Sequence, residues 1–152
     1  MRSLLRLLLL LFIFGCTFSS CCSSRKTTNT NSIVSKLEGT WELNYISGPR
    51  IAFDGLYPGK KPVIRFDVAG QRVSGNTSCN SFNGKLNAEG NKISFKDPMA
   101  MTKMMCLNGN GEAVFLETLQ KINSWSVTDG NTLNLIMGDI GMMRFVKKTD
   151  KQ

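Results

Sequence analysis

Sulfur-bearing side chains are the groups in this sequence best suited to chemistry. Methionines are concentrated just before Cys106, and thioether sulfur is a donor that Cu(I) prefers. The cluster consists of Met99, Met101, Met104 and Met105. In an extended strand, neighbouring side chains point to opposite faces, so these sulfurs would not converge on one ion. Because the chain also has no histidine to complete such a site, we expect no metal site and no cofactor, and we interpret the methionines as core packing.

The absence of histidine also bears on catalysis. It removes the commonest general base and any Ser–His or Cys–His nucleophile pair. The acidic residues are scattered singly and are not spaced as a pair of catalytic carboxylates. Asn80 could be a polar site residue, but asparagine in a turn usually bonds the neighbouring backbone, and we assign it that role. We therefore predict that the protein is not an enzyme.

The N-terminus has the pattern of an export signal. Arg2 and Arg6 precede an unbroken apolar run at residues 7–14. This run is far shorter than the roughly twenty residues that a membrane-spanning helix needs, and it has the length of a signal-peptide core. We therefore expect the chain to be exported.

The apolar run ends in the sequence Ile-Phe-Gly-Cys at residues 13–16, which resembles a bacterial lipobox. An aliphatic residue stands three positions before the cysteine and a small residue stands immediately before it. We predict a signal peptide at residues 1–15 and lipid attachment at Cys16, with Cys21 as the alternative attachment site. A plain secretory signal without a lipid remains the second alternative.

Composition divides the remaining chain into a tether, a domain and a tail. Residues 16–35 are rich in serine, threonine and asparagine, and they bury too little apolar surface to fold, so we predict a flexible tether. The domain follows at residues 36–148, and residues 149–152 form a tail. No acidic run follows Cys16, which favours a domain that is anchored in the outer membrane and faces the periplasm.

The basic residues are dispersed along the chain. Removal of residues 1–15 takes away two arginines and lowers the formal net charge from +8 to +6. We interpret the lysines as ordinary solvated surface charge, with attraction to anionic lipid or to an acidic partner as the alternative. Because no nucleic-acid-binding motif is present, we expect no nucleic acid partner.

The domain has the hydrophobic pattern of short strands. Residues 39–47 alternate, with Trp41, Leu43 and Tyr45 on one face. A loop is expected over residues 48–61. Further strands are predicted over residues 62–68, 71–74, 81–86, 92–95, 100–106, 124–128, 131–137 and 141–147. We expect the strands at 81–86 and 92–95 to pair as a hairpin turned at 87–91, and Asp129-Gly130 to turn a second hairpin.

One helix is predicted after residue 108. Phe115, Leu119 and Ile122 recur at helical spacing, and Glu112 and Lys121 suit the two ends of the helix dipole. About eight antiparallel strands with one helix favour a barrel, because closure removes exposed sheet edges. The predicted fold class is therefore mainly β: a small closed or nearly closed antiparallel barrel with one helix packed on it.

Residues 73–106 resemble the core of the META domain, the family of HslJ-like envelope lipoproteins induced by heat shock. The first matching group is Cys79-Asn80, with Phe82 and Gly84 after it. The second group is Ala100-Met101-Thr102, followed by Met104-Met105-Cys106. The resemblance covers roughly residues 37–146, which is almost the whole domain.

The resemblance implies a lipocalin-like barrel and a pairing of two cysteines. A disulfide between Cys79 and Cys106 would close a loop of 27 residues and contribute about 3–4 kcal/mol of stability. Two buried, reduced thiols that pack as small hydrophobes are the alternative. An oxidising envelope favours the disulfide.

The resemblance also implies a non-enzymatic envelope protein that binds another protein or acts under envelope stress. The alternative is a binder of a small apolar or amphipathic ligand inside the barrel. A hollow interior would favour the second function, whereas an interior filled with aromatic side chains would count against it. The side chains that decide this are Trp41, Phe66, Phe82, Phe95 and Trp125.

Overall fold

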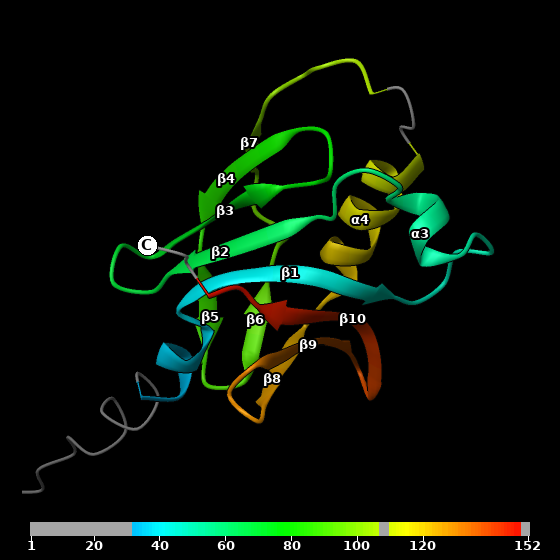
Figure 1. The fold of residues 1–152 in the computed structure, drawn as a ribbon. Helices are drawn as coiled ribbons and strands as arrows, with labels where there is room; N and C mark the ends of the chain where they lie inside the picture. The colour runs from blue at the N-terminus through cyan, green and yellow to red at the C-terminus, as the bar shows by residue number, and fades with distance from the viewer. Residues whose placement is uncertain (1–31, 107–109, 150–152) are drawn as a thin grey trace, which may run out of the picture.

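The computed structural model describes residues 32–106 and 110–149, which form one antiparallel sheet of ten strands with helices packed on it (Figure 1). The strand order across the sheet is β5-β6-β8-β9-β10-β1-β2-β3-β4-β7. The strands are β1 (Gly39–Ile46), β2 (Val63–Asp67), β3 (Arg72–Asn76), β4 (Ser81–Lys85), β5 (Asn87–Glu89), β6 (Lys92–Ser94), β7 (Ala100–Met101), β8 (Ser124–Thr128), β9 (Thr132–Met137) and β10 (Ile140–Lys147). The predicted mainly β, antiparallel architecture is confirmed.

The sheet is strongly curled, but it is not a closed barrel (Figure 1). Its two edge strands are β5 and β7, and they do not pair with each other in the part of the chain that the structure describes. The ladder is weakest between β6 and β8, where Lys92 and Ser124 are the one registered pair. Helix α4 (Asn110–Lys121) buries Phe115 and Leu119 in the core. The predicted helix is present, but the prediction of closure was wrong, because the edge strands β5 and β7 have three and two residues and are too short to form a closing ladder.

The strand pairing differs from the prediction around residue 86. Strand β4 pairs with β3 and β7, whereas β5 pairs with β6 in a tight hairpin at Gly90, whose φ is +57°. The chain passes from β4 to β5 through Leu86 alone. The predicted hairpin between residues 81–86 and 92–95 is therefore wrong, because alternation indicates a strand without indicating its partner.

Strand β1 shows how a bulge changes which side chains are buried. Trp41 and Leu43 are buried as predicted, but Tyr45 is 44% exposed and Ile46 is buried in its place. The pairing of β1 with β10 shifts register between Leu43 and Tyr45. One extra residue at a bulge moves the following side chains to the opposite face, so the predicted position of Tyr45 was wrong.

The hairpin of β8 and β9 follows the prediction. Asp129 and Gly130 have φ values of +53° and +66°, the left-handed conformations that a two-residue turn of this kind requires. Trp125 lies opposite Leu135, and Val127 lies opposite Leu133. Local sequence was enough here because the turn fixes the register.

Short helical segments in the described part of the chain also lie outside the sheet. The 3-10 turn η1 (Ser35–Leu37) is held to β1 by the Trp41 indole N–H, which donates to the Leu37 carbonyl at 2.7 Å. Val34, which the sequence assigned to the tether, is buried in the core, so order begins before the predicted domain boundary. Helix α3 (Phe53–Leu56) interrupts the predicted loop. Within the described ranges, no helix has the length and apolar character needed to cross a bilayer.

The interior of the curled sheet is filled by side chains. The five aromatic residues that were expected to decide between a filled and a hollow interior, Trp41, Phe66, Phe82, Phe95 and Trp125, are each at most 4% exposed. Phe115 from α4 adds a sixth aromatic ring, centred 6.1 Å from the ring of Phe82. This packing counts against a ligand inside the sheet.

Gly75, in β3, has no space beside it for a side chain. A Cβ at this position would meet the backbone carbonyl of Val63 and would lie 2.7 Å from the ring of Phe82. Gly75→Ala should therefore lower the free energy of unfolding by about 1–3 kcal/mol, measured by urea denaturation. Gly141→Ala is the matched control, because nothing lies within 4 Å of the corresponding Cβ. Equal losses in the two variants would contradict the steric explanation.

Candidate functional site

The turn between β3 and β4 positions the first two residues of the site, Cys79 and Asn80. The Thr77 amide donates to the Asn80 carbonyl at 2.8 Å, and the Asn80 amide donates to Thr77 Oγ1 at 3.0 Å. Ser78 has a φ of +89°, and its amide donates to Asn76 Oδ1 at 2.9 Å. The turn is therefore held in part by hydrogen bonds among its own residues.

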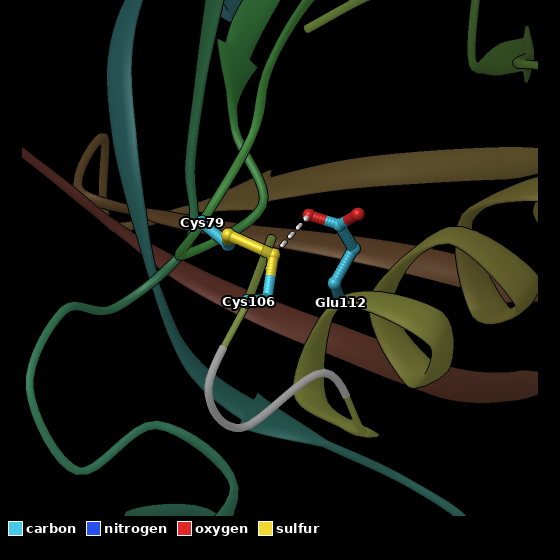
Figure 2. Close-up of side chains that lie close together, drawn as sticks. All are labelled: Cys79, Cys106 and Glu112. Atoms are coloured by element: carbon cyan, nitrogen blue, oxygen red, sulfur yellow. Dashed lines mark hydrogen bonds between the residues drawn. A yellow bond between two sulfur atoms is a disulfide. The ribbon is translucent and has the colours of Figure 1, made fainter. Parts of the chain in front are cut away.

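A disulfide joins this turn to the segment that follows β7. Cys79 and Cys106 form the pairing that the family resemblance implied, with their Cα atoms 5.9 Å apart (Figure 2). The predicted strand over residues 100–106 is wrong beyond Met101, because residues 102–106 have no regular structure. The Thr102 amide still donates to the Ser81 carbonyl at 3.0 Å, and beyond it the disulfide and side-chain bonds hold this irregular segment.

Asn80 is the centre of those bonds and is only 3% exposed. Its Oδ1 accepts from Thr102 Oγ1 at 2.8 Å and from the Met104 amide at 2.7 Å. Its Nδ2 donates to the Met104 carbonyl at 3.3 Å and to the Glu112 carboxylate at 3.1 Å. The expectation that this side chain bonds the neighbouring backbone of the turn was wrong, because its hydrogen bonds tie the turn to residues 102–104 and to α4.

Glu112 is the residue of the site that sequence reasoning missed. It lies in the first turn of α4, where a negative charge interacts favourably with the helix dipole. Its carboxylate accepts one hydrogen bond from the hydroxyl of the buried Thr77 and another, of 3.1 Å, from the backbone amide of Asn80. The sequence indicated only a first-turn acid, since nothing local relates Glu112 to a turn more than thirty residues earlier.

The same carboxylate lies beside the disulfide. Figure 2 marks the contact of 3.9 Å between Glu112 Oε2 and Cys106 Sγ. We regard it as a close contact, because a disulfide sulfur has no proton to donate. The two sulfurs and the carboxylate oxygen all lie within 4.8 Å of one another. In a disulfide the sulfurs are not thiolates, so this oxidised cluster is not a metal site.

The other residues of the family motif lie mainly on β4 and β7, the two strands next to this cluster in the sequence. Phe82 is buried, and a Cβ on Gly84 would lie 2.8 Å from the Met99 side chain, so the glycine permits that close contact. Met101 lies opposite Phe82 and packs against the core. The Thr102 hydroxyl also accepts a bond of 3.0 Å from the Ser81 amide. These residues position the segment that ends at Cys106.

The methionines of the cluster separate into two groups. Met99 and Met101 are partly buried against the core, as predicted. Met104 and Met105 are 59% and 95% exposed, so the prediction of core packing was wrong for these two. They leave the core because residues 102–106 follow the disulfide and Asn80 instead of a strand.

A surface hollow of about 360 Å³ lies against the disulfide. One wall comes from α3 and the residues after it, and the other comes from the turn and the segment before α4. The lining residues are Leu56, Tyr57, Pro58, Gly59, Lys60, Ser78, Cys79, Met105 and Cys106. The disulfide is therefore reachable from solvent through this hollow.

Tyr57 connects this hollow to α4. Its hydroxyl donates to the Gly111 carbonyl at 2.9 Å, and burial raises the pKa of Tyr57 from 10.0 to about 12. The folded protein therefore retains the phenolic proton at pH values where the unfolded chain loses it.

We expect Tyr57 to make the protein less stable at high pH. A raised native pKa gives a contribution that is complete below pH 10 and is lost as the pH rises towards 12. The free energy of unfolding should fall by about 1 kcal/mol between pH 9 and pH 11, measured by urea denaturation. Tyr57→Phe should lack this part of the fall. An identical pH dependence in both proteins would show that Tyr57 does not cause it.

Both predicted lipid-attachment residues, Cys16 and Cys21, lie outside the residues that the structure describes. The signal peptide, most of the tether and the last residues of the tail also lie outside them. Their assignment remains a prediction from sequence.

Comparison with known proteins identifies one family and several solved structures with a related fold. A family model of the META domain matches residues 35–150. A structure of a protein from Burkholderia xenovorans, solved by NMR, is 21% identical, with a TM-score of 0.60, and the match covers 78% of this chain and 88% of that one. A crystal structure of a DUF4847 family protein from Bacteroides vulgatus is 14% identical, with a TM-score of 0.51, and the match covers 78% of this chain and 99% of that one. No curated protein matches the chain. At these identities the two structures support the fold alone.

Proposed function

Because this chain belongs to the META domain family, we propose that it is a lipid-anchored protein of the bacterial cell envelope whose domain binds another protein. The sequence supports the anchor through the apolar run at residues 7–14 and the lipobox-like ending at Cys16. HslJ-like envelope lipoproteins are the usual members of this family, which supports the same location. The anchor would place the domain at the outer membrane, facing the periplasm.

Met105 has an exposed side chain on a fixed backbone, and this observation supports a protein as the partner. Met105 is 95% exposed, yet its neighbour Cys106 is fixed by the disulfide and Met104 is fixed by Asn80. An exposed apolar side chain on a fixed backbone loses little conformational freedom on binding, and methionine is enriched in protein interfaces. Met105 therefore has the properties of an interface anchor.

The hollow beside Met105 supports a partner of a particular kind. A projecting side chain next to a concave surface gives a protein partner both an anchor and a recess to fill. Lys60 lines the hollow, and the exposed Lys103 lies two residues before Met105. We propose that the partner inserts an apolar side chain into the hollow and surrounds it with acidic residues.

Two observations support a binding role over catalysis or interior ligand binding. The polar groups of Asn80 and Glu112 bond to each other, to Thr77 and to residues 102–104, so they serve the structure of the site. Aromatic side chains fill the interior of the sheet, which removes the space that a small apolar ligand would need. We therefore propose a non-enzymatic binding module and do not favour the interior ligand.

Labelling with a fatty-acid analogue in living bacteria tests the anchor. The full chain should incorporate the label, and Cys16→Ala should abolish incorporation, whereas Cys21→Ala should leave it unchanged. Loss of the label in Cys21→Ala alone would move the attachment to the alternative cysteine. A chain that is exported without any label would refute the lipid anchor.

Site-specific photo-crosslinking in cells tests the protein partner. A photoreactive residue at Met105 should give a discrete protein adduct, and Lys60→Glu should weaken it by reversing a charge at the hollow. The same probe at Ile140, which is exposed on β10 and does not line the hollow, is the matched control. The same adduct from both positions, or none from Met105, would refute this interface.

A further inference from the structure

We propose that reduction of the Cys79–Cys106 disulfide creates a binding site for a thiophilic divalent cation such as Zn²⁺, with two thiolates and the Glu112 carboxylate as ligands. This site goes beyond the proposed binding of a protein partner and does not depend on it. The oxidised form holds the three residues together, and reduction changes the two sulfurs into ligands.

The distances within the cluster suit this role. Zinc–ligand bonds of about 2.0–2.3 Å place neighbouring ligand atoms of a tetrahedral site roughly 3.5 Å apart. Glu112 Oε2 already lies 3.9 Å from Cys106 Sγ, and all three ligand atoms lie within 4.8 Å of one another (Figure 2). Once the sulfur–sulfur bond is broken, the main movement required is the separation of the two sulfurs. Rotation of the cysteine side chains supplies that movement without a change of fold.

The residues around the cluster are arranged as supporting groups. Asn80 Nδ2 lies 3.4 Å from Cys106 Sγ and 3.7 Å from Cys79 Sγ. A disulfide sulfur is a weak acceptor, whereas a thiolate accepts strongly from such an amide, so reduction strengthens these contacts. Thr77 fixes the Glu112 carboxylate through its hydroxyl. Groups that orient metal ligands in this way raise affinity in known metal sites.

The hollow provides access for the reductant and the cation. Both cysteines line it, so a dithiol can attack the disulfide from solvent without unfolding the core. The same opening leaves a coordination position for water, as in zinc sites with three protein ligands. Lys60, which also lines the hollow, offsets part of the negative charge of two thiolates and a carboxylate.

A dithiol supplies all the electrons and protons that reduction of the disulfide requires. The dithiol transfers two electrons and two protons, its own sulfurs become a disulfide, and Cys79 and Cys106 become thiols. Binding of one divalent cation then releases the two thiol protons to solvent. No other reactant is needed.

Cadmium titration of the full chain tests the proposal. Cys16, Cys21 and Cys22 are replaced by serine, so that the domain provides the two remaining thiols, and a phosphine reduces the disulfide. The reduced protein should bind one equivalent of Cd²⁺ with thiolate charge-transfer absorption and release two protons, whereas the oxidised protein should bind none. Glu112→Gln should weaken binding by about tenfold or more. Glu117→Gln, an exposed acid on the same helix, should leave it unchanged.

Circular dichroism, recorded in parallel, shows whether the reduced protein is still folded, so that each outcome of the titration can be interpreted. If reduction leaves the fold intact, a protein that binds no Cd²⁺, or equal affinity in the wild type and Glu112→Gln, overturns the proposal. If reduction unfolds the chain, Cd²⁺ should restore the fold, because metal binding then stabilises the native arrangement. Failure to restore it, or equal binding in urea, would mean that two thiols act without the folded site and would also overturn the proposal.

Discussion

Replacement of Cys79 and Cys106 by alanine together should lower the free energy of unfolding by about 3–4 kcal/mol. The disulfide joins residues 27 positions apart, and a crosslink of this span removes much of the conformational freedom of the unfolded chain. It also holds residues 102–106, which have no strand ladder of their own. Urea denaturation at neutral pH measures the loss as a shift of the midpoint, and the slope should rise as the unfolded chain expands.

The reduced protein is the matched control for this substitution. With Cys16, Cys21 and Cys22 replaced by serine, reduction should remove about as much stability as the double alanine variant does. The protection of the residue 102–106 amides from hydrogen exchange should fall further than that of β9 and β10, because the crosslink fixes this segment directly. A loss below about 1 kcal/mol would contradict the interpretation, since it would mean that strain in the native bridge offsets the entropic gain.

The elements that could be predicted from sequence are those fixed by short-range chemistry. Asp129-Gly130 dictates a tight turn, and the alternation in β10 places Met143 and Phe145 in the core. Helix α4 follows from the spacing of Phe115 and Leu119. In each case the residues that determine the structure lie within one turn or one strand of each other.

The incorrect predictions concern contacts between residues that lie far apart in the sequence. Alternation in β4 indicates a strand, but residues 87–89, which were expected in a turn, form strand β5 and are the partner of β6 in place of β4. The bulge that exposes Tyr45 depends on the fit of β1 against β10, which the sequence of β1 alone does not contain. Closure of the barrel was wrong because the edge strands β5 and β7 do not pair in the described residues, and pairing between two distant edges is likewise not encoded in either segment alone.

The candidate site was only half predictable. The pairing of Cys79 and Cys106 followed from the family resemblance, and the compartment favoured it. The bonds of Asn80 to Met104 and Glu112 span more than twenty residues, and no hydrophobic period marks a buried polar contact. The exposure of Met105 is a consequence of these bonds, so it could not be foreseen before the network was known.

Asn80→Ala should lower the free energy of unfolding by about 3 kcal/mol, nearly as much as loss of the disulfide. The substitution leaves the Met104 amide without its acceptor and removes the side-chain donor that faces the Glu112 carboxylate. Each buried polar group that loses its partner costs about 1–3 kcal/mol. Asn83→Ala is the matched control, because that side chain is exposed on the neighbouring strand and its loss should cost at most about 0.5 kcal/mol.

Asn80→Asp separates the donor bonds of this side chain from its acceptor bonds. The aspartate keeps the acceptors for Thr102 and Met104, but it places a second carboxylate against Glu112 and removes both amide protons. Repulsion between two partly desolvated carboxylates should make this variant less stable than Asn80→Ala at neutral pH. Thermal and urea unfolding of the wild type, Asn80→Ala and Asn80→Asp measure the order of their stabilities. If Asn80→Asp were as stable as the wild type, the contact with Glu112 would contribute nothing, and the acceptor bonds alone would hold the segment that carries Met105.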